Sequence, residues 1–498
     1  MRKLSLLALL IIEFSLIFLS GCKFFNPPET PKGIPPEQFG KKYTVENIKL
    51  DLDFLVRTLE DVHPDLYAYT AQKIFLKEYR SLKQKLTSPL TRIEFYFHIA
   101  PLVAMLKDGH TKVYPVYEEY YHYRRKGGLL FPLDVNIQDD ETIVTANYSS
   151  DQIPAPGSIL LSINERKTST LIDEWLPLVS GKRLVKRLDY LSDFHFYRHF
   201  LWLTCPSDSL FTLKFIPHNE DKIITHTVTG VTYQNIIKKR QLKNQKQNHY
   251  SYQTLSDTIG LLTISLFPGN EEAFGKFLKK VFGELKQKKI QDLIIDIRNN
   301  GGGFSPAEME LLRYLTDKPI ARIPRMDIKV SRQIKKYYRL SMPKLFRWFP
   351  MQWFHPAWRK IWKASEGSIV TVSSDPKKLK NTPLRFKGNI YVLIGPGTFS
   401  TAADFGARIK DYDLGELVGA ETGGLATSFG AFYPFRLPYT KLLIRVSHKR
   451  IYRPNGEDKG RGVLPHHLVS ITNPRGNISL GLDTVLRYTV ELIKSRNE

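Results

Sequence analysis

The chain has 498 residues, of which 42% are hydrophobic and 12% aromatic; this apolar content excludes a globally disordered protein. The length exceeds what one simple core accommodates, so we expect two or three folding units. Lysine and arginine outnumber aspartate and glutamate by 73 to 49, giving a formal net charge of +24. The basic residues are scattered and accompany no zinc-finger or RNA-binding signature, which predicts a solvated basic surface and no nucleic-acid partner.

The N-terminus has the pattern of an export signal. Two basic residues precede an apolar stretch over 4–19, and Ser20-Gly21-Cys22 follows. Small residues at this point allow a signal peptidase to reach the extended backbone. A cysteine directly after them resembles the lipobox of bacterial lipoproteins. That resemblance implies a signal peptide over 1–21 and a diacylglyceryl thioether on Cys22. An uncleaved transmembrane helix is the alternative, although the apolar stretch is at the short end for one.

The lipobox also predicts where the protein acts. We expect it in the cell envelope, anchored by lipid to a bacterial membrane and facing the periplasm or the exterior. Residues 22–43 are rich in proline and predict a lipidated tether. The membrane, with its acidic headgroups, is then an expected partner of the basic surface. Only Cys205 remains as a thiol after lipidation, which excludes an intramolecular disulfide in the mature chain.

The next two segments differ in periodicity. Residues 44–126 carry apolar side chains near helical spacing in three stretches, which predicts an N-terminal helical region. Residues 127–235 instead alternate in short runs between turn residues, as in a small β-rich module. Within it, Pro156 to Asn164 followed by an amphipathic stretch over 169–179 resembles the second half of a PDZ domain. A PDZ groove binds a peptide by strand addition; another kind of small β-barrel is the alternative.

Residues 250–475 alternate between expected buried strands and expected amphipathic helices, as in a βαβ core, and an insertion over 316–386 interrupts this pattern. The expected strands are 259–266, 293–297, 390–394, 416–418 and 439–447, and the expected helices are 271–288, 306–315 and 401–410. Residues 346–362 of the insertion contain four Trp and three Phe, which predicts an inserted aromatic lobe. It either packs against the core or presents a membrane-facing or substrate-covering surface. Residues 476–498 predict a C-terminal helix.

Two turns that follow buried strands have the residues needed for chemistry. The turn over 296–303 ends in three glycines and presents backbone N–H groups at a helix N-terminus, an arrangement that stabilises an oxyanion. It also suits a phosphate, but it lacks the spacing of dinucleotide-binding and P-loop motifs. The turn over 395–404 places Ser400 at a tight bend among small residues. Taken alone, Ser400 is better explained as a helix N-cap, because a serine at a helix start more often has that role.

Together the two turns resemble the family of C-terminal processing and tricorn-like serine peptidases, which also includes the interphotoreceptor retinoid-binding protein repeats. The resemblance runs from about 44 to 475 and includes Gly462-Val463-Leu464-Pro465. It implies an α/β multidomain protein, in which a helical region and a PDZ-like module precede a crotonase-like ββα core. Ser400 then becomes the nucleophile, and the oxyanion donors become the N–H groups of Thr401 and of Gly302 or a neighbouring glycine. The resemblance implies polypeptide substrates. The sequence has no His-Glu-x-x-His motif, and His195 with His199 lacks a nearby third ligand, so we expect no metal site and no cofactor.

The chain departs from the family pattern at two positions. Ala403 replaces a usual Glu, and Leu425 stands where the processing-protease branch has its lysine base. A hydroxyl needs a base, and the tricorn-like branch takes a histidine from the end of the N-terminal region. His110, in Asp108-Gly109-His110-Thr111, matches that element and is the candidate general base. The acidic residue that would orient it is Glu457 or Asp458, between which the sequence does not decide.

Three functions remain open at this point. The leading hypothesis is a membrane-anchored serine peptidase that cleaves polypeptides or peptides of the cell envelope through an acyl-enzyme on Ser400. The second is a catalytically inactive envelope binding protein for a peptide or an apolar ligand. It is favoured by Leu425, by Ala403 and by the resemblance to the retinoid-binding branch, and the aromatic residues of 346–362 would then line its pocket. The third is an envelope structural protein, which would have no ligand cleft. The oligomeric state is left open.

Overall fold

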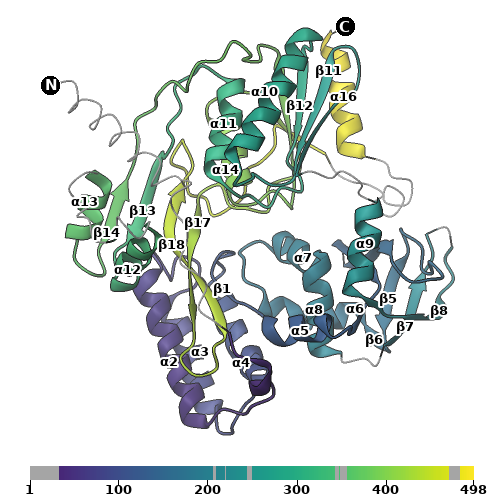
Figure 1. Ribbon diagram of the computed structural model, residues 1–498, viewed down its shortest axis with the longest axis vertical. Helices are drawn as coiled ribbons and strands as arrows, with labels where there is room; N and C mark the ends of the chain where they lie inside the picture. The colour runs from purple at the N-terminus through teal and green to yellow at the C-terminus, as the bar shows by residue number, and fades with distance from the viewer. Residues whose placement is uncertain are drawn as a thin grey trace.

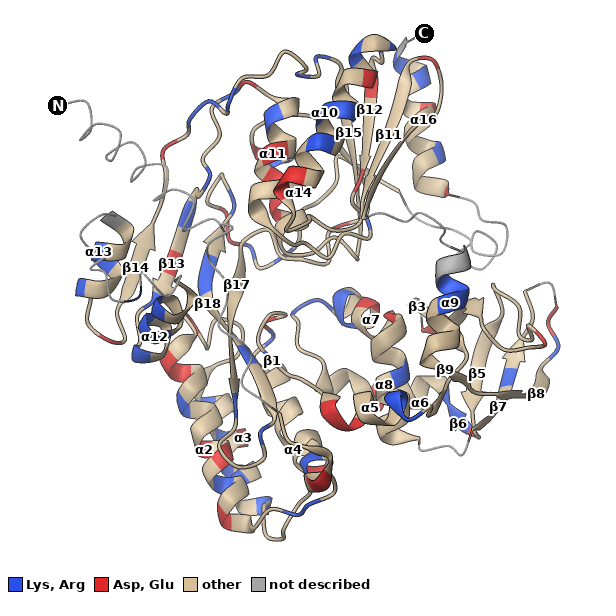
Figure 2. Ribbon diagram, viewed as in Figure 1, with Lys and Arg blue, Asp and Glu red and all other residues tan. Residues whose placement is uncertain are grey.

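The computed structural model describes residues 33–138, 140–205, 209–218, 220–243, 249–342, 347, 356–469 and 483–497. The predicted signal peptide, Cys22, most of the tether and much of the aromatic segment over 346–362 lie outside these ranges. None of the helices in the described part combines the length and the apolar character needed to cross a bilayer. Lys and Arg residues are spread over all parts of the ribbon (Figure 2).

The C-terminal half is built on a six-stranded sheet in the order β10-β11-β12-β15-β16-β19. All neighbouring strands are parallel except β10 and β11, which are antiparallel. The strands are β10 (Tyr250–Thr254), β11 (Ile259–Ile264), β12 (Asp292–Asp296), β15 (Asn389–Ile394), β16 (Glu416–Gly419) and β19 (His467–Leu468). Their helices are α10 (Glu271–Gln287), α11 (Ser305–Leu315), α14 (Thr401–Asp411) and α16 (Thr484–Asn497).

Side chains alternate across this sheet, so each face has its own core. Leu293 and Ile295 of β12 pack with α10, α11 and α14, while Ile294 packs on the opposite face with α16. Helices therefore cover both faces of the parallel strands (Figure 1). The edge where these strands end at their carboxyl termini is the place where an open α/β sheet holds its ligand site.

A second sheet joins the N-terminal helices to segments from late in the chain. It runs β1-β18-β13-β14, with β17 paired to β18. Its strands are β1 (Lys112–Val113), β13 (Arg325–Lys329), β14 (Ile369–Val372), β17 (Ser428–Arg436) and β18 (Leu443–Tyr452). The surrounding helices are α2 (Val45–Val62), α3 (Gln72–Lys85), α4 (Arg92–Ala104), α12 (Arg332–Ser341) and α13 (Pro356–Lys363).

This sheet corrects two expectations. The strand expected within 439–447 is not part of the catalytic core's sheet, because β18 pairs with β1, β13 and β17. The described part of the 316–386 insertion is also not a separate lobe. Met326, Ile334 and Trp358 share one hydrophobic cluster with Leu52 and Leu55 of α2. The insertion thus completes the N-terminal region, because its apolar face is buried against those helices (Figure 1).

The β-rich module forms a third unit, to which α7 and α8 are attached. Its main sheet runs β3-β4-β5-β7-β8, with β6 paired to β5, and β2 pairs with β9. The strands are β2 (Leu129–Leu130), β3 (Leu133–Gln138), β4 (Glu141–Asn147), β5 (Ile159–Ile163), β6 (Arg166–Lys167), β7 (Leu210–Ile216), β8 (Ile224–Thr229) and β9 (Val231–Thr232). The helices are η1 (Pro36–Gln38), which precedes the module, α5 (Tyr117–Arg125), α6 (Thr168–Trp175), η2 (Leu176–Leu178), α7 (Leu184–Ser192), α8 (Phe194–Thr204) and α9 (Tyr233–Lys243).

The expected α/β multidomain architecture is confirmed, and most expected helices and strands form within a few residues of their predicted bounds. The crotonase-like and PDZ-like assignments stay predictions. The loop between α4 and β1, the turn between β15 and α14, and the segment before α7 meet in one place, so each of the three units contributes to a single cleft.

Candidate active site

Ser400 occupies the turn that joins β15 to α14 in a backbone conformation rare for a residue with a side chain. Its φ is 54° and its ψ is −127°. Ser400 stands at the N-cap position of α14, yet its side chain makes no capping hydrogen bond. The explanation of Ser400 as an ordinary helix cap is therefore wrong, because a cap accepts from the helix's own N–H groups. A strained, uncapped serine aimed into a cleft is a feature of functional sites.

The two turns singled out in the sequence are bound to each other. The Thr398 hydroxyl donates to the carbonyl of Ile297 (2.9 Å), and the N–H of Phe399 donates to the carbonyl of Asn300 (3.0 Å). Gly302 packs directly on Ser400: a Cβ added to Gly302 would lie 2.7 Å from the Ser400 Cβ. The close approach and the φ of +104° at Gly302 both require glycine.

His110 reaches this turn from the loop between α4 and β1. β1 pairs antiparallel with β18, so the loop lies beside the second sheet. The Thr111 hydroxyl accepts a hydrogen bond from the N–H of Ser447 (3.0 Å), and the Ser447 hydroxyl donates to Asp108 Oδ2 (2.6 Å). These bonds attach the loop that carries His110 to a strand more than 330 residues later in the chain.

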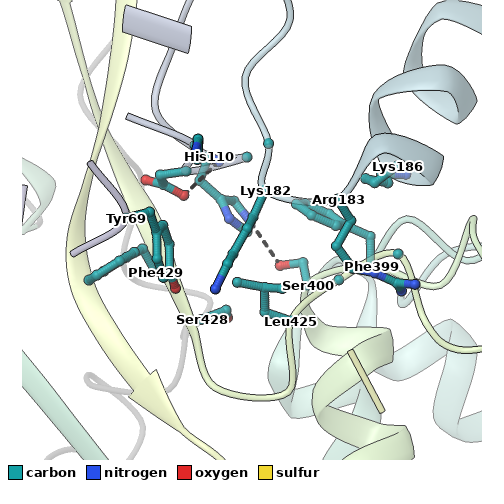
Figure 3. Close-up of a pocket in the computed structure, with 16 residues that line it drawn as sticks. Tyr69, His110, Lys182, Arg183, Lys186, Phe399, Ser400, Leu425, Ser428 and Phe429 are labelled. Atoms are coloured by element: carbon teal, nitrogen blue, oxygen red, sulfur yellow. Dashed lines mark hydrogen bonds between the residues drawn. The ribbon is translucent and has the colours of Figure 1, made fainter. Parts of the chain in front are cut away.

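The His110 Nε2 atom lies 3.2 Å from Ser400 Oγ, across 290 residues of sequence (Figure 3). The imidazole stacks on the Phe399 ring, with centroids 4.7 Å apart and an angle of 26° between the planes. The backbone of Phe429 on β17 also hydrogen-bonds the imidazole and raises its pKa, so the imidazole is the donor in this bond. A backbone carbonyl therefore holds the ring with one nitrogen facing Ser400.

Burial lowers the pKa of His110 below its ordinary value. The negative charge of Asp108 opposes this shift, whereas the positive charges of Lys112 and Lys186 add to it. A lowered pKa keeps the imidazole neutral near pH 7, and only the neutral form accepts a proton from a hydroxyl. The electrostatics of the cleft thus suit a general base at His110.

Asp108, which the sequence interpretation gave no role, organises the His110 loop. Its Oδ1 accepts the backbone N–H of His110 (3.0 Å), and its Oδ2 accepts the hydroxyls of Thr111 and Ser447 and contacts His63 Nε2 at 3.3 Å. Burial alone would raise the Asp108 pKa, but the bonds and charge from His63, together with His110 and Ser447, hold this pKa well below its usual range. Asp108 is therefore a buried carboxylate whose hydrogen bonds hold the His110 loop against the neighbouring segments that contain Ser447 and His63.

Glu457 and Asp458, the two predicted orienting carboxylates, are engaged elsewhere. Glu457 is 42% exposed and pairs with Lys459 (2.9 Å), while Asp458 pairs with Arg450. Neither carboxylate hydrogen-bonds His110, so the expectation that one of them holds the ring is corrected. The sequence did not reveal the substitute, because a backbone carbonyl such as that of Phe429 leaves no residue-type signal.

The predicted oxyanion donors lie against Ser400 but differ in availability. The N–H of Thr401 is the first of α14, a position without an acceptor inside the helix. The N–H of Gly302 already donates to Asn300 Oδ1 (2.8 Å). Gly302 can serve an oxyanion only by sharing or releasing this bond, which makes Thr401 the better prepared donor.

The cleft around Ser400 encloses about 420 Å³ of empty space, including its opening to solvent. Leu425, at the position of the missing lysine, contributes an apolar wall. Within the described ranges, no cluster of three or more His, Cys, Asp or Glu side chains is placed to hold a metal ion. The lining residues that sequence reasoning missed are aromatic or basic: Tyr69, Phe399, Phe429, Lys107, Lys182, Arg183 and Lys186.

Comparison with known proteins gives a family match for the C-terminal half and structural matches for most of the chain. Residues 258–469 match peptidase family S41. In structure, the chain is similar to mature CPAF complexed with lactacystin, with 18% identity, 90% of this chain and 97% of that chain covered, and a TM-score of 0.61. It is similar to a CPAF mutant at 16% identity, with 90% and 98% covered and a TM-score of 0.64. No curated protein is a significant match in sequence.

The likeness to CPAF extends over nearly the whole chain, so the helical region and the β-rich module share that fold along with the core. The match over 258–469 contains both glycine-rich turns and Ser400. The chain therefore contains a peptidase family S41 domain over 258–469 and is a serine-type peptidase.

Proposed function

We propose that this protein is a lipid-anchored serine peptidase of the cell envelope that cleaves polypeptides through an acyl-enzyme on Ser400, with His110 as general base. The observation that carries the proposal is the 3.2 Å contact between His110 Nε2 and Ser400 Oγ. An inactive binding protein would not need this contact, which requires the β1–β18 pairing and the strained turn at Ser400 together.

The chemistry follows from these atoms. His110 Nε2 takes the Ser400 proton as Oγ bonds to the scissile carbonyl carbon, and the N–H of Thr401 donates to the oxyanion that forms. Collapse of the tetrahedral centre breaks the C–N bond, and His110 gives its proton to the leaving amine. Water, deprotonated by His110, then attacks the acyl-enzyme and releases the new carboxylic acid and the Ser400 hydroxyl.

Labelling with a fluorophosphonate tests the nucleophile. The wild type is expected to be labelled, and Ser400→Ala is expected to be unlabelled and inactive against a peptide library. His110→Ala should keep the fold and lose labelling by about 10²–10⁴-fold in rate, the usual contribution of a general base. Labelling of Ser400→Ala at the wild-type rate would refute the assignment.

The envelope location rests on Cys22 and the residues before it, which resemble a lipobox. Metabolic labelling with a palmitate analogue in a bacterial host tests it. The wild type should carry the label and sediment with membranes, whereas Cys22→Ala should do neither. An unlabelled wild type that remains in the soluble fraction would refute the anchor while leaving the peptidase proposal intact.

A further inference from the structure

The lining of the active-site cleft is positively charged. Four of its residues are cationic, namely Lys107, Lys182, Arg183 and Lys186, and Asp108 is its one acidic residue among the described ranges. Asp108 is only 4% exposed and its oxygens are taken up by hydrogen bonds within the His110 loop. A bound substrate therefore meets the cations, and not the carboxylate, at the cleft surface.

These cations differ in how far the protein neutralises them. The Arg183 guanidinium pairs with Glu421 (3.0 Å) and donates to the carbonyl of Thr422. Lys186 Nζ pairs with Asp189 (2.5 Å). Lys182 Nζ has no carboxylate within 4.0 Å among the residues that the structure describes. Lys182 is thus an uncompensated positive charge beside the reacting atoms.

Lys182 and Lys186 flank the catalytic pair and are held by aromatic rings. Lys182 Nζ lies 4.6 Å from the centroid of Tyr69, and Lys186 Nζ lies 5.0 Å from that of Phe399. Figure 3 shows the Lys182 side chain running past Ser400, with its amine pointing toward Ser428. A cation within about 6 Å of an aromatic ring centroid is attracted by the ring, so the rings help to hold both amines in place before any ligand binds.

The Lys182 amine also contacts the loop that contains Gly460. A Cβ added to Gly460 would lie 2.0 Å from Lys182 Nζ, so this amine lies directly against the Gly460 backbone. Asp458, two residues before Gly460, pairs with Arg450, and among the described residues it forms no ion pair with Lys182. Lys182 lies just before α7 and Lys186 lies in its first turn, so the β-rich module supplies this charge to the core's active site.

We propose that Lys182, with Lys186 across the catalytic pair, binds a carboxylate of the polypeptide substrate next to the scissile bond. The inference rests on the proposed function and adds the substrate class: chains that carry a free α-carboxylate or an acidic side chain near the cut. A cationic cleft attracts a carboxylate and repels basic side chains and amino termini, so it discriminates by charge as well as by affinity.

Paired peptides test this proposal in the full chain purified in detergent. Fluorescent peptides that differ only in Glu against Gln, or in a C-terminal acid against an amide, are bound to Ser400→Ala and followed by anisotropy. We expect the acid form to bind about 10-fold more tightly, a plausible gain for a charge-assisted contact of roughly 1.4 kcal/mol. Lys182→Met should reduce this preference to about 2-fold or less.

The matched control is Lys280→Met, which removes one charge from an exposed position on α10. An equal loss of preference in this variant, or an unchanged preference in Lys182→Met, would overturn the proposal. If Lys182→Met loses the preference for the C-terminal acid over the amide, Lys182 binds the carboxylate of a chain end. If it loses the preference for Glu over Gln, Lys182 binds the carboxylate of a side chain. If the wild type cleaves no peptide while Ser400→Ala keeps a Lys182-dependent preference, the peptidase proposal fails and this one stands.

Discussion

Replacing Asp108 by Asn tests whether this buried carboxylate holds the His110 loop in place. Asp108 Oδ1 accepts the N–H of His110, and Oδ2 accepts the hydroxyls of Thr111 (2.5 Å) and Ser447 (2.6 Å) and contacts His63. An amide has one oxygen, so its NH₂ group must face a donor at one of the two positions. Even in the better orientation, the NH₂ group opposes the His110 N–H.

The magnitude follows from these contacts. One buried donor left without an acceptor costs about 1–3 kcal/mol, and the remaining bonds lose the extra strength of a charged acceptor. The total agrees with the 3–5 kcal/mol that breaking a buried charged pair typically costs. For a region of this size, we expect Asp108→Asn to lower the midpoint of thermal unfolding by roughly 5–10 °C.

Activity adds a second readout with a definite sign. The negative charge of Asp108 raises the His110 pKa, so its removal should lower that pKa. The acidic limb of the kcat/KM profile should then move to lower pH, while kcat itself falls because the His110 loop is displaced. Stability should also respond to pH: the depressed Asp108 pKa stabilises the native state at neutral pH, and this contribution is lost in acid.

Calorimetry and pH-dependent peptide hydrolysis measure these effects, with Glu457→Gln and Asp458→Asn as comparison variants. Their carboxylates bind other partners, so both should keep kcat/KM within about 3-fold of the wild type, as surface substitutions usually do. The reasoning is refuted if Asp108→Asn unfolds within 1–2 °C of the wild type (about 0.5 kcal/mol or less by the same scaling). It is also refuted if either comparison variant loses more activity than Asp108→Asn.

Two further variants test the geometry and charge around the nucleophile. Gly302→Ala should abolish fluorophosphonate labelling, because the new Cβ would lie 2.7 Å from the Ser400 Cβ at a φ of +104°; a normal labelling rate would contradict the close approach. Lys186→Met should raise the His110 pKa, because its positive charge lowers it, and should therefore move the acidic limb of kcat/KM to higher pH. A shift toward lower pH would show that Lys186 does not act on His110 through its charge.

The sequence by itself determined the local structure and the family. Helices, buried strands and glycine-rich turns depend mainly on the types and spacing of neighbouring residues. The βαβ elements and the turn that carries Ser400 could therefore be predicted from the sequence. The order of the two turns was enough to indicate a serine peptidase, and residues 258–469 match peptidase family S41. His110 was named as the base for Ser400 from a short motif and a family resemblance, without any indication of how the two distant segments meet.

The tertiary structure decided how distant segments meet. The β1–β18 pairing brings the His110 loop to Ser400, and Phe429 reaches the imidazole because β17 is the next strand. The insertion joins the N-terminal helices for the same reason: β13 pairs with β18. Strand pairing across hundreds of residues depends on register and on which apolar faces are buried together. Strand register and the pairing of apolar faces leave no periodic signal in the sequence. The contacts of Glu457 and Lys182 could therefore not be predicted, and only the structure shows that Glu457 is away from His110 and that Lys182 lines the cleft.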